Sequence, residues 1–250
     1  MTIIKLDAID STSSYLSALW RQDLFAPPVA VYTSNQLAGR GRRGDSWQSE
    51  PYKNLTISFL LDYCSKDATQ SFALIMQTSL VVMHLLGQLG VPNLAIKWPN
   101  DIMSGSKKIC GILVERALLG SQSSPFVVGV GINVNQQDFE SLTHATSVRL
   151  KTDETFDIDA LARRLSTSLE EATNGQIQLE PLAYVALLNQ FEEVLYRKGD
   201  YCEVSVNRAD YQTVKIVGVT SEGRLRVQDT NEREFLLDSA ETRFVYAEKC

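Results

Sequence analysis

The segment GRGRRG, Gly39 to Gly44, is the most distinctive stretch of this 250-residue chain. Its three arginines lie in a protein whose net charge is −6. Glycine lets the backbone approach a ligand closely, and neighbouring backbone amides form a concavity that binds anions. Arginine adds planar forks of donors that match carboxylate or phosphate. The segment is therefore predicted to be a loop that clamps an anionic small molecule.

The same loop has two other interpretations. GRGRRG matches the dinucleotide-binding pattern G-x-G-x-x-G, but that motif requires a helix directly after it, and 45–54 is polar and contains Pro51. A solvated basic turn is the other alternative. Because the guanidiniums repel one another and glycine adds backbone freedom, we expect the free loop to be disordered and to order when a ligand binds.

Composition narrows the class of protein. A hydrophobic content of 44% is enough for a substantial core in one large or two smaller domains. The four cysteines contain no C-x-x-C pair, which argues against a zinc site or a disulfide framework. We find no signal-peptide pattern and expect no membrane span, so the protein is predicted to be cytoplasmic. The acidic balance disfavours nonspecific nucleic-acid binding.

Hydrophobic periodicity predicts an α+β fold with two domains, 1–196 and 197–250. In the first, strands are expected at Met1–Ile9, Val29–Thr33, Asn54–Leu61, Leu94–Trp98, Ile109–Glu115 and Phe126–Asn135, and helices at Asp67–Gly90, Asp157–Asn174 and Leu182–Leu195. In the second, short alternating strands are expected at Tyr201–Val206, Thr213–Thr220, Arg224–Gln228, Glu234–Leu237 and Arg243–Tyr246, which indicates a small SH3-like β-barrel.

Several polar residues follow predicted element boundaries and are candidates for ligand contact. Ser11, Thr12 and Ser13 begin a helix, where a hydroxyl either caps the helix or binds a polar ligand. After Pro99, Asn100 and Asp101 either form a self-stabilising turn or bind Mg²⁺ or an incoming amine.

Glycines within predicted strands point to a second group of candidates. Gly111, three residues after the surface lysine pair that ends at Lys108, marks a close approach by a ligand or by another backbone. Gly129 and Gly131 leave one face of their strand bare, as a flat floor for a planar ligand or for tight packing. Trp47 is either a core anchor or an aromatic face for a base.

Five motifs in this order resemble the signature of the biotin protein ligases. They are Gln36 with AGRGRRG, then Trp47, KWPND at 97–101, KKICGILVE at 107–115 and VGVGINVN at 128–135, with a weaker element, ATSV, at 145–148. The resemblance covers nearly the whole chain. It implies a mixed sheet with helices on one face, similar to class II aminoacyl-tRNA synthetases.

The resemblance also implies roles for individual residues. Biotin contacts are expected from Ser11, Thr12, Ser13, Gln36, Gly39, Arg40, Gly41, Arg42, Lys108 and Gly111, and ATP or adenylate contacts from Arg40, Arg42, Trp47, Asn100, Lys108 and Asn133. Lys108, Arg42 and Asp101 are the expected catalytic residues. Mg²⁺ is expected to arrive with ATP, with no certain protein ligands.

The family attaches biotin to a lysine of a carrier protein through biotinyl-5′-AMP, so ATP and biotin are the expected substrates. The expected partner is the biotin carboxyl carrier subunit of acetyl-CoA carboxylase. No helix-turn-helix precedes the catalytic region, so DNA binding is not expected, and a homodimer is left open. A lipoate ligase-like acyl-adenylating enzyme and a non-catalytic biotin-binding protein are the alternatives.

Overall fold

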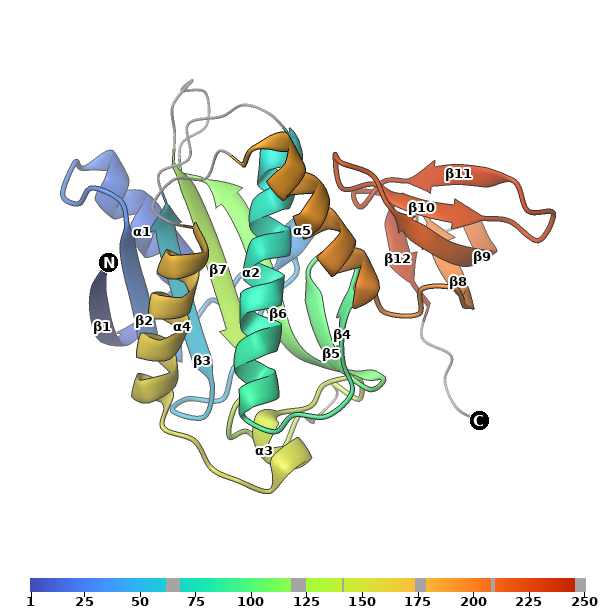
Figure 1. The fold of residues 1–250 in the computed structure, drawn as a ribbon. Coiled ribbons are helices and arrows are strands. Elements are labelled where there is room, and N and C mark those ends of the chain that lie inside the picture. Colours follow the sequence, from blue (N-terminus) through green and yellow to red (C-terminus); the bar gives the residue numbers. More distant parts are fainter. Residues whose placement is uncertain (62–67, 118–124, 141, 174–178, 208–209, 246–250) are drawn as a thin grey trace.

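A seven-stranded mixed sheet forms the centre of the computed structural model, in the order β1-β2-β3-β7-β6-β5-β4 (Figure 1). The structure describes residues 1–61, 68–117, 125–140, 142–173, 179–207 and 210–245. The strands are β1 (Thr2–Ile9), β2 (Val29–Gln36), β3 (Leu55–Leu61), β4 (Leu94–Lys97), β5 (Asp101–Ser104), β6 (Lys107–Arg116) and β7 (Phe126–Ile132). β1 and β2 are parallel, whereas the other neighbouring pairs are antiparallel. The predicted mixed sheet is confirmed.

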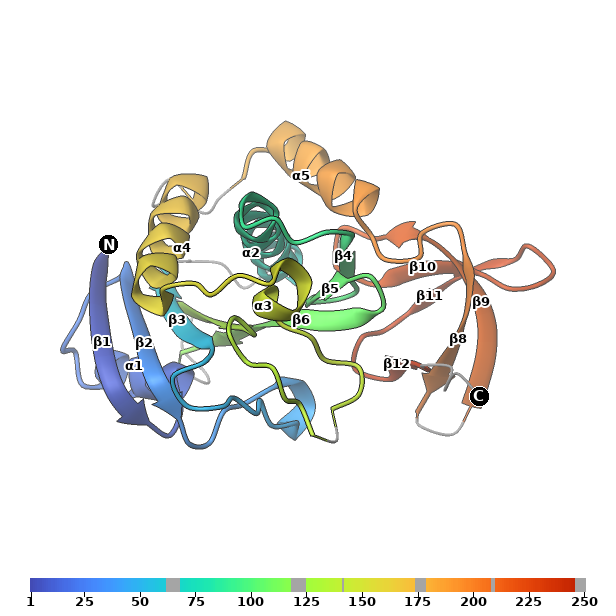
Figure 2. The same cartoon turned by 90° about the horizontal axis from the view of Figure 1, so that it is seen from below.

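Helices lie on both faces of this sheet, so the expectation of helices on one face is wrong for the first helix. α2 (Ala68–Gln88), α3 (Val148–Thr152), α4 (Ile158–Thr173) and α5 (Pro181–Glu193) lie on one side, and α1 (Thr12–Arg21) on the other (Figure 2). Leu16 and Leu19 of α1 pack in a cluster with Val29 and Val31 of β2. Ala30 and Tyr32, which alternate with them along β2, belong to the core on the opposite face of the sheet. Because both faces of β2 are apolar, the sequence did not indicate which face α1 would cover.

The alternation of β3 decides where a ligand has access to the sheet. Ile57 and Phe59 belong to the core beneath α2, whereas Thr56 and Ser58 point to the other face. α1 covers one end of that other face, where Leu60 joins its apolar cluster. The middle of the face is left lined by hydroxyls and glycines.

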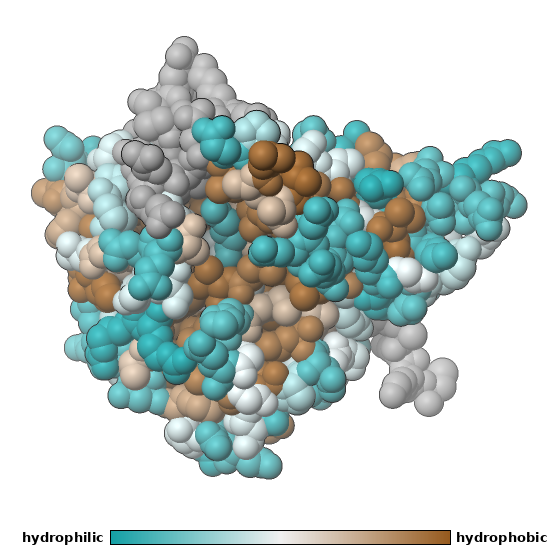
Figure 3. Space-filling model, in the orientation of Figure 1, coloured by the Kyte–Doolittle hydropathy of each residue, from teal (hydrophilic) through white to brown (hydrophobic). Residues whose placement is uncertain are grey.

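α2 is the central core helix. Its Thr69–Gln88 segment has a mean hydropathy of 1.3 and, by length and composition alone, is long and apolar enough to cross a bilayer. However, 56% of that segment is buried inside the fold, which is how a core helix of a globular domain behaves. On this side of the molecule apolar surface also gathers over α5 (Figure 3), where Leu182 and Val185 are exposed.

The C-terminal part is a five-stranded antiparallel sheet in the order β11-β10-β9-β8-β12. Its strands are β8 (Tyr201–Val206), β9 (Asp210–Val219), β10 (Leu225–Gln228), β11 (Glu234–Leu237) and β12 (Thr242–Phe244), close to the predicted ranges. This sheet shares the main core, because Val204 and Ile216 belong to the same cluster as the residues beneath α2. The Trp98 indole also donates to the Gly223 carbonyl at 2.9 Å.

Besides a 3₁₀ turn at Arg42–Gly44 in the glycine-arginine loop, two short elements were not predicted. β5 begins at Asp101, for which a self-stabilising turn with Asn100 was one of the alternatives; the turn comprises 98–100, and Asp101 pairs with Lys97 across the β4–β5 hairpin. α3 is the other, a five-residue helix capped by Ser147. Both elements are too short to show a periodic pattern. Of the cysteines, Cys110 and Cys202 are free and buried, while Cys64 and Cys250 lie outside the described residues.

Candidate functional site

A pocket of about 440 Å³ occupies the sheet face that α1 leaves open. Residues from both sheets and from the glycine-arginine loop line it. They are Ser11, Thr12, Ser13, Gln36, Arg40, Gly41, Arg42, Arg43, Asp45, Ser46, Trp47, Thr56, Ile57, Ser58, Lys97, Trp98, Pro99, Asn100, Asp101, Lys108, Gly111, Ile112, Leu113, Gly129, Val130, Gly131, Thr242, Arg243 and Phe244. The structure thus brings together every predicted site residue except Gly39 and Asn133.

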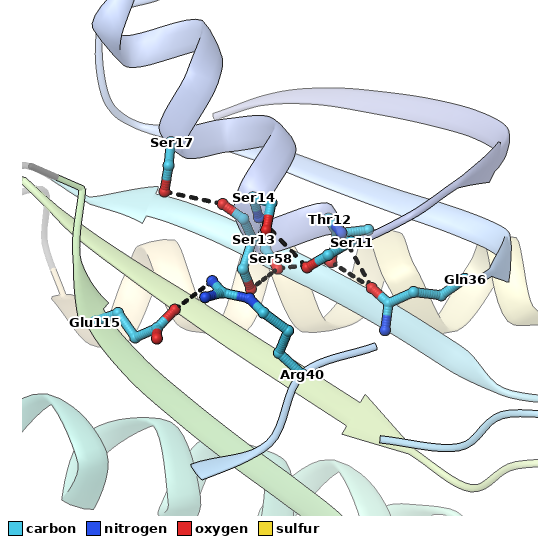
Figure 4. Close-up of polar contacts among 9 residues, drawn as sticks. All are labelled: Ser11, Thr12, Ser13, Ser14, Ser17, Gln36, Arg40, Ser58 and Glu115. Carbon is cyan, nitrogen blue, oxygen red and sulfur yellow. Dashed lines mark hydrogen bonds and ion pairs between the residues drawn. The ribbon is translucent and has the colours of Figure 1, made fainter. Parts of the chain in front are cut away.

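One end of the pocket is a buried cluster of hydroxyls (Figure 4). Thr12 donates from its backbone and its hydroxyl to Gln36 Oε1, at 3.0 and 3.2 Å. Ser58 lies within 2.7 Å of the Thr12 hydroxyl and 2.9 Å of the Ser13 hydroxyl. Ser11 accepts from the Ser14 amide as the helix cap. Sequence reasoning missed Ser58, although the polar alternation within β3 was the available signal.

The floor of the pocket is the predicted bare strand surface. A methyl group at Gly131 would run into the Trp47 indole, and one at Gly111 would lie 3.0 Å from it. At the hydroxyl end, a methyl group at Gly129 would lie 2.9 Å from Ser13 Oγ. Trp47 therefore lies flat on the glycines, and its indole nitrogen has no hydrogen-bond partner among the described residues. The ring packs on the sheet, as a core anchor would, and also lines the pocket. Its role as an aromatic face for a base stays a prediction.

The other end of the pocket gathers positive charge. Lys108 Nζ lies 2.6 Å from Asp101 Oδ1 and 5.4 Å from the centre of the Trp47 ring. Lys97 is buried beside them, with its Nζ 5.3 Å from the Phe244 ring. Burial lowers the pKa of Lys97 to about 8, with Asp101 opposing the shift and Lys108 adding to it. Lys97 was not predicted as a site residue, although KWPND contains it.

Arg42 joins this cationic end. It donates to Asn100 Oδ1 at 3.4 Å and to Ser239 Oγ at 2.8 Å. Burial, and then repulsion from Arg43, lower the pKa of Arg42. A partly buried guanidinium with neutral hydrogen-bond partners is suited to an anionic ligand. Asn100 is itself fixed, because its amide donates to the Ile112 carbonyl at 2.5 Å.

The glycine-arginine loop is folded as a tight hairpin over the pocket. Trp47 N donates to Gly39 O at 2.9 Å, and Gly41 N donates to Asp45 O at 2.7 Å. At the tip, Arg43 and Gly44 have φ of 56° and 79°, values that favour glycine. The expectation that the loop is disordered until a ligand binds stays a prediction.

Two predicted site residues lie outside the pocket lining. A methyl group at Gly39 would collide with the Trp47 carbonyl, so this glycine allows the hairpin to close. Asn133 is buried, and its side-chain amide donates to the Thr146 carbonyl at 2.9 Å. Here Asn133 holds two loops together, and its contact with adenine or phosphate remains a prediction.

β12 of the C-terminal sheet forms one wall of the pocket, which sequence reasoning did not foresee. Arg243 lies 3.5 Å from Asp45 of the hairpin. The buried hydroxyl of Thr242 has no hydrogen-bond partner among the described residues. A buried hydroxyl without a partner is costly, which points to a ligand or water at this wall.

Comparison with known proteins agrees with this geometry. Residues 6–133 match the Biotin/lipoate A/B protein ligase family. The chain is 32% identical over 139 residues to the bifunctional ligase/repressor BirA of Escherichia coli K12, covering 56% of this chain and 42% of that protein. It is 33% identical over 124 residues to the biotin–[acetyl-CoA-carboxylase] ligase of Mycobacterium tuberculosis, covering 48% and 44%. The matched region is thus less than half the length of these relatives.

Solved structures extend the likeness to the whole fold. The biotin protein ligase of Aquifex aeolicus in complex with biotin and ATP superposes with a TM-score of 0.75 at 23% identity, covering 98% of this chain and 99% of that one. The Leishmania major biotin protein ligase in complex with biotinyl-5-AMP gives 0.62 at 21% identity, covering 95% and 99%. With the matched 6–133 region spanning half of the sequence, this chain belongs to the biotin/lipoate A/B protein ligase family.

Proposed function

We propose that this protein is an ATP-dependent biotin protein ligase, which makes biotinyl-5′-AMP and passes the biotinyl group to a lysine of a carrier protein. A single observation carries the proposal: one continuous pocket joins a hydroxyl end to a cationic end across a bare glycine floor. The hydroxyl end suits the ureido ring of biotin, since that ring has both donors and acceptors. The cationic end suits a carboxylate and a triphosphate.

The first step brings two anions together. A carboxylate oxygen of biotin attacks the α-phosphorus of ATP, and the bond from that phosphorus to the pyrophosphate oxygen breaks. Lys108, Arg42 and Lys97 offset the repulsion and stabilise the charge on the departing pyrophosphate, which is the electrostatic route of phosphoryl transfer. No thiolate is required, and burial raises the pKa of nearby Cys110 far above neutrality.

The second step transfers the acyl group. The amine of a carrier lysine attacks the acyl carbon of the mixed anhydride, and AMP leaves. The hairpin shelters the anhydride from water until the carrier arrives. Asp101, which is held beside Lys108, is the carboxylate that would orient the amine. The carrier would be a biotin carboxyl carrier protein, because the Mycobacterium tuberculosis relative is named for acetyl-CoA carboxylase.

Mg²⁺ would enter bound to the triphosphate. Within the part of the chain that the structure describes, no group of three or more His, Cys, Asp and Glu side chains is able to hold a metal ion. Mg²⁺ bound to nucleotides needs only one or two carboxylates besides phosphate oxygens, and Asp101 fits that requirement. The ion would supply charge neutralisation at the phosphates.

A lipoate ligase-like activity is the second candidate, because the matched family includes both substrate classes. The hydroxyl cluster favours biotin, since the dithiolane ring of lipoate has no strong donor or acceptor to pair with these groups. A biotin-binding protein without turnover is the remaining alternative. It would bind biotin but exchange no pyrophosphate.

The test is ATP–pyrophosphate exchange with biotin or lipoate in turn. The wild type should exchange with biotin, and Lys108→Ala should lose about 10²–10³ of the rate, the usual effect of removing one transition-state charge contact. Lys107→Ala is the matched control, because Lys107 is the exposed neighbour outside the pocket. Exchange with lipoate alone, or none with either acid, would refute the proposal.

Finer features belong to the same proposal. We place the domain boundary at 196/197, interpret the C-terminal sheet as SH3-like and the main sheet as related to class II aminoacyl-tRNA synthetases. The protein would act in the cytoplasm, without binding DNA or a membrane, as a monomer or a homodimer.

A further inference from the structure

Two arginines of the hairpin, Arg40 and Arg42, point to opposite ends of the pocket. Arg42 reaches the cationic end, as described above. Arg40 Nη2 instead lies 2.5 Å from Glu115 Oε2 on β6. Figure 4 shows the Arg40 side chain crossing the strands, with its guanidinium between Glu115 and the hydroxyl cluster. The two arginines were expected to bind one anion together, but in this structure only Arg42 lies at the cationic end.

The position of Glu115 follows from the strand register. Gly111, Leu113 and Glu115 alternate along β6 and so share one face of the sheet. Leu113 pairs with Gly129, which lies against Ser13. Glu115 is two residues farther on, about 7 Å along the strand. Its carboxylate thus stands just past the hydroxyl end, where the pocket stops and the apolar cluster under α1 begins.

A carboxylate at this place changes what Arg40 can do. The ion pair neutralises the Arg40 guanidinium, so Arg40 contributes less to binding an anion than Arg42 or Lys108. The pair does, however, join the hairpin to strand β6 of the sheet beside the hydroxyl end of the pocket. An exposed ion pair is weak, which suits a contact that must open for each substrate and product.

We propose that Glu115 is a positioning residue that latches the hairpin shut through Arg40 and so slows escape from the hydroxyl end of the pocket. The inference rests on the proposed function, because it assumes that biotin binds at the hydroxyl end. The Arg40–Glu115 pair needs no ligand, because both residues belong to the chain. The latch therefore predicts a hairpin that is closed part of the time in the free protein, in place of the disordered free loop expected from the sequence.

The test compares Glu115→Gln, Arg40→Gln and the double variant. We expect each single variant to raise the dissociation rate of biotin about two- to fivefold, the range for an exposed ion pair, and the double variant to add nothing further. Raising the salt from about 0.1 to 1 M should speed dissociation from the wild type but not from Glu115→Gln, because screening removes only an existing pair.

The control is Asp159→Asn, which breaks a pair of nearly the same geometry away from the pocket. Lys5 and Asp159 lie 2.7 Å apart with side chains 43% and 36% exposed, against 44% and 37% for Arg40 and Glu115. Dissociation of biotin from this variant should match the wild type.

A second measurement needs no ligand. Amide hydrogen exchange at Gly41 and Trp47, which donate the hairpin hydrogen bonds, should accelerate in Glu115→Gln and not in Asp159→Asn. Three results would overturn the latch. Amide exchange at Gly41 and Trp47 could be unchanged in Glu115→Gln, or the two substitutions could have additive effects on the dissociation rate of biotin. Dissociation could also be fast from Arg40→Gln and normal from Glu115→Gln. Failure of the wild type to bind biotin would instead refute the proposed function, and amide exchange would still decide the latch.

Discussion

Lys97 illustrates how the environment of one residue sets its chemistry. Its side chain is buried beside Lys108 and Asp101, and the ammonium group has lost most of its hydration. Desolvation disfavours the charged form of a lysine, so its pKa falls towards the working pH range. The residue is therefore a cation whose charge depends on pH, at the end of the pocket where we place the triphosphate.

We expect kcat/KM for ATP to fall as the pH rises through about 8, because Lys97 then loses its proton in the free enzyme. The stability of the fold should change in the opposite direction. Between pH 8 and 10.5 the folded chain binds fewer protons at Lys97 than the unfolded chain does, so stability rises with pH there. Steady-state kinetics and denaturant unfolding across this pH range measure both trends.

Lys97→Met tests whether Lys97 causes the pH dependence of kcat/KM and of stability. It removes the titrating group and keeps an unbranched apolar stem, so the variant should bind ATP weakly at every pH. The kinetic fall and the rise in stability near pH 8 should both disappear. If Lys97→Met showed the same pH dependence of kcat/KM and of stability as the wild type, the titrating group would be a different residue.

At the scale of elements, β6 and β7 form a floor that only glycines allow. Gly111 and Gly131 pair across the two strands, and the Trp47 indole lies on both. Neither glycine has a positive φ, so close approach rather than backbone strain explains them. The hairpin can therefore descend onto the sheet because two side chains are missing beneath it.

Gly131→Ala should lift the hairpin, because the new methyl group would overlap the Trp47 indole. Overpacking of this kind costs about 1–3 kcal/mol, and we expect that loss in the binding free energy of biotin, measured by calorimetry. Gly87→Ala in α2 is the control, since its methyl group would meet only Leu94 Cδ1 at 3.9 Å. A normal biotin affinity for Gly131→Ala would show that the hairpin does not close in this way.

At the scale of the whole molecule, the C-terminal sheet completes the pocket rather than standing apart from it. Ser239 accepts from Arg42, and Arg243 lies near Asp45, so both sides of the hairpin contact this sheet. The shared core fixes the two sheets against each other. The nucleotide end of the pocket therefore depends on residues about 200 positions away from the hairpin.

Arg243→Gln should raise KM for ATP about fivefold, as expected for losing one partly exposed charge contact of about 1 kcal/mol, and leave the affinity for biotin unchanged. The matched control is Arg226→Gln on the same sheet, whose partner Glu234 is 3.4 Å away and whose side chain is 40% exposed. Equal effects of the two substitutions would indicate a general destabilisation of the sheet rather than a nucleotide contact.

Most of the elements, and candidate residues at both ends of the pocket, were predicted from the amino-acid sequence. Long periodic segments such as α2 and α4 followed the pattern closely, because repeated burial on one face leaves a strong signal. The loop glycines and the hydroxyls at the start of α1 were also predicted, since glycine and capping motifs are local in the chain, whereas Lys108 was expected only from the family resemblance.

Features that depend on contacts between distant segments could be read only from the packed fold. Burial of Lys97, pairing of Arg40 with Glu115, and the wall made by β12 each join residues far apart in the chain. Local patterns state which face of an element is polar, but not which other element will lie against that face. That choice depends on how the two sheets and α1 pack, because packing alone sets which side chains meet and which charges lose their water.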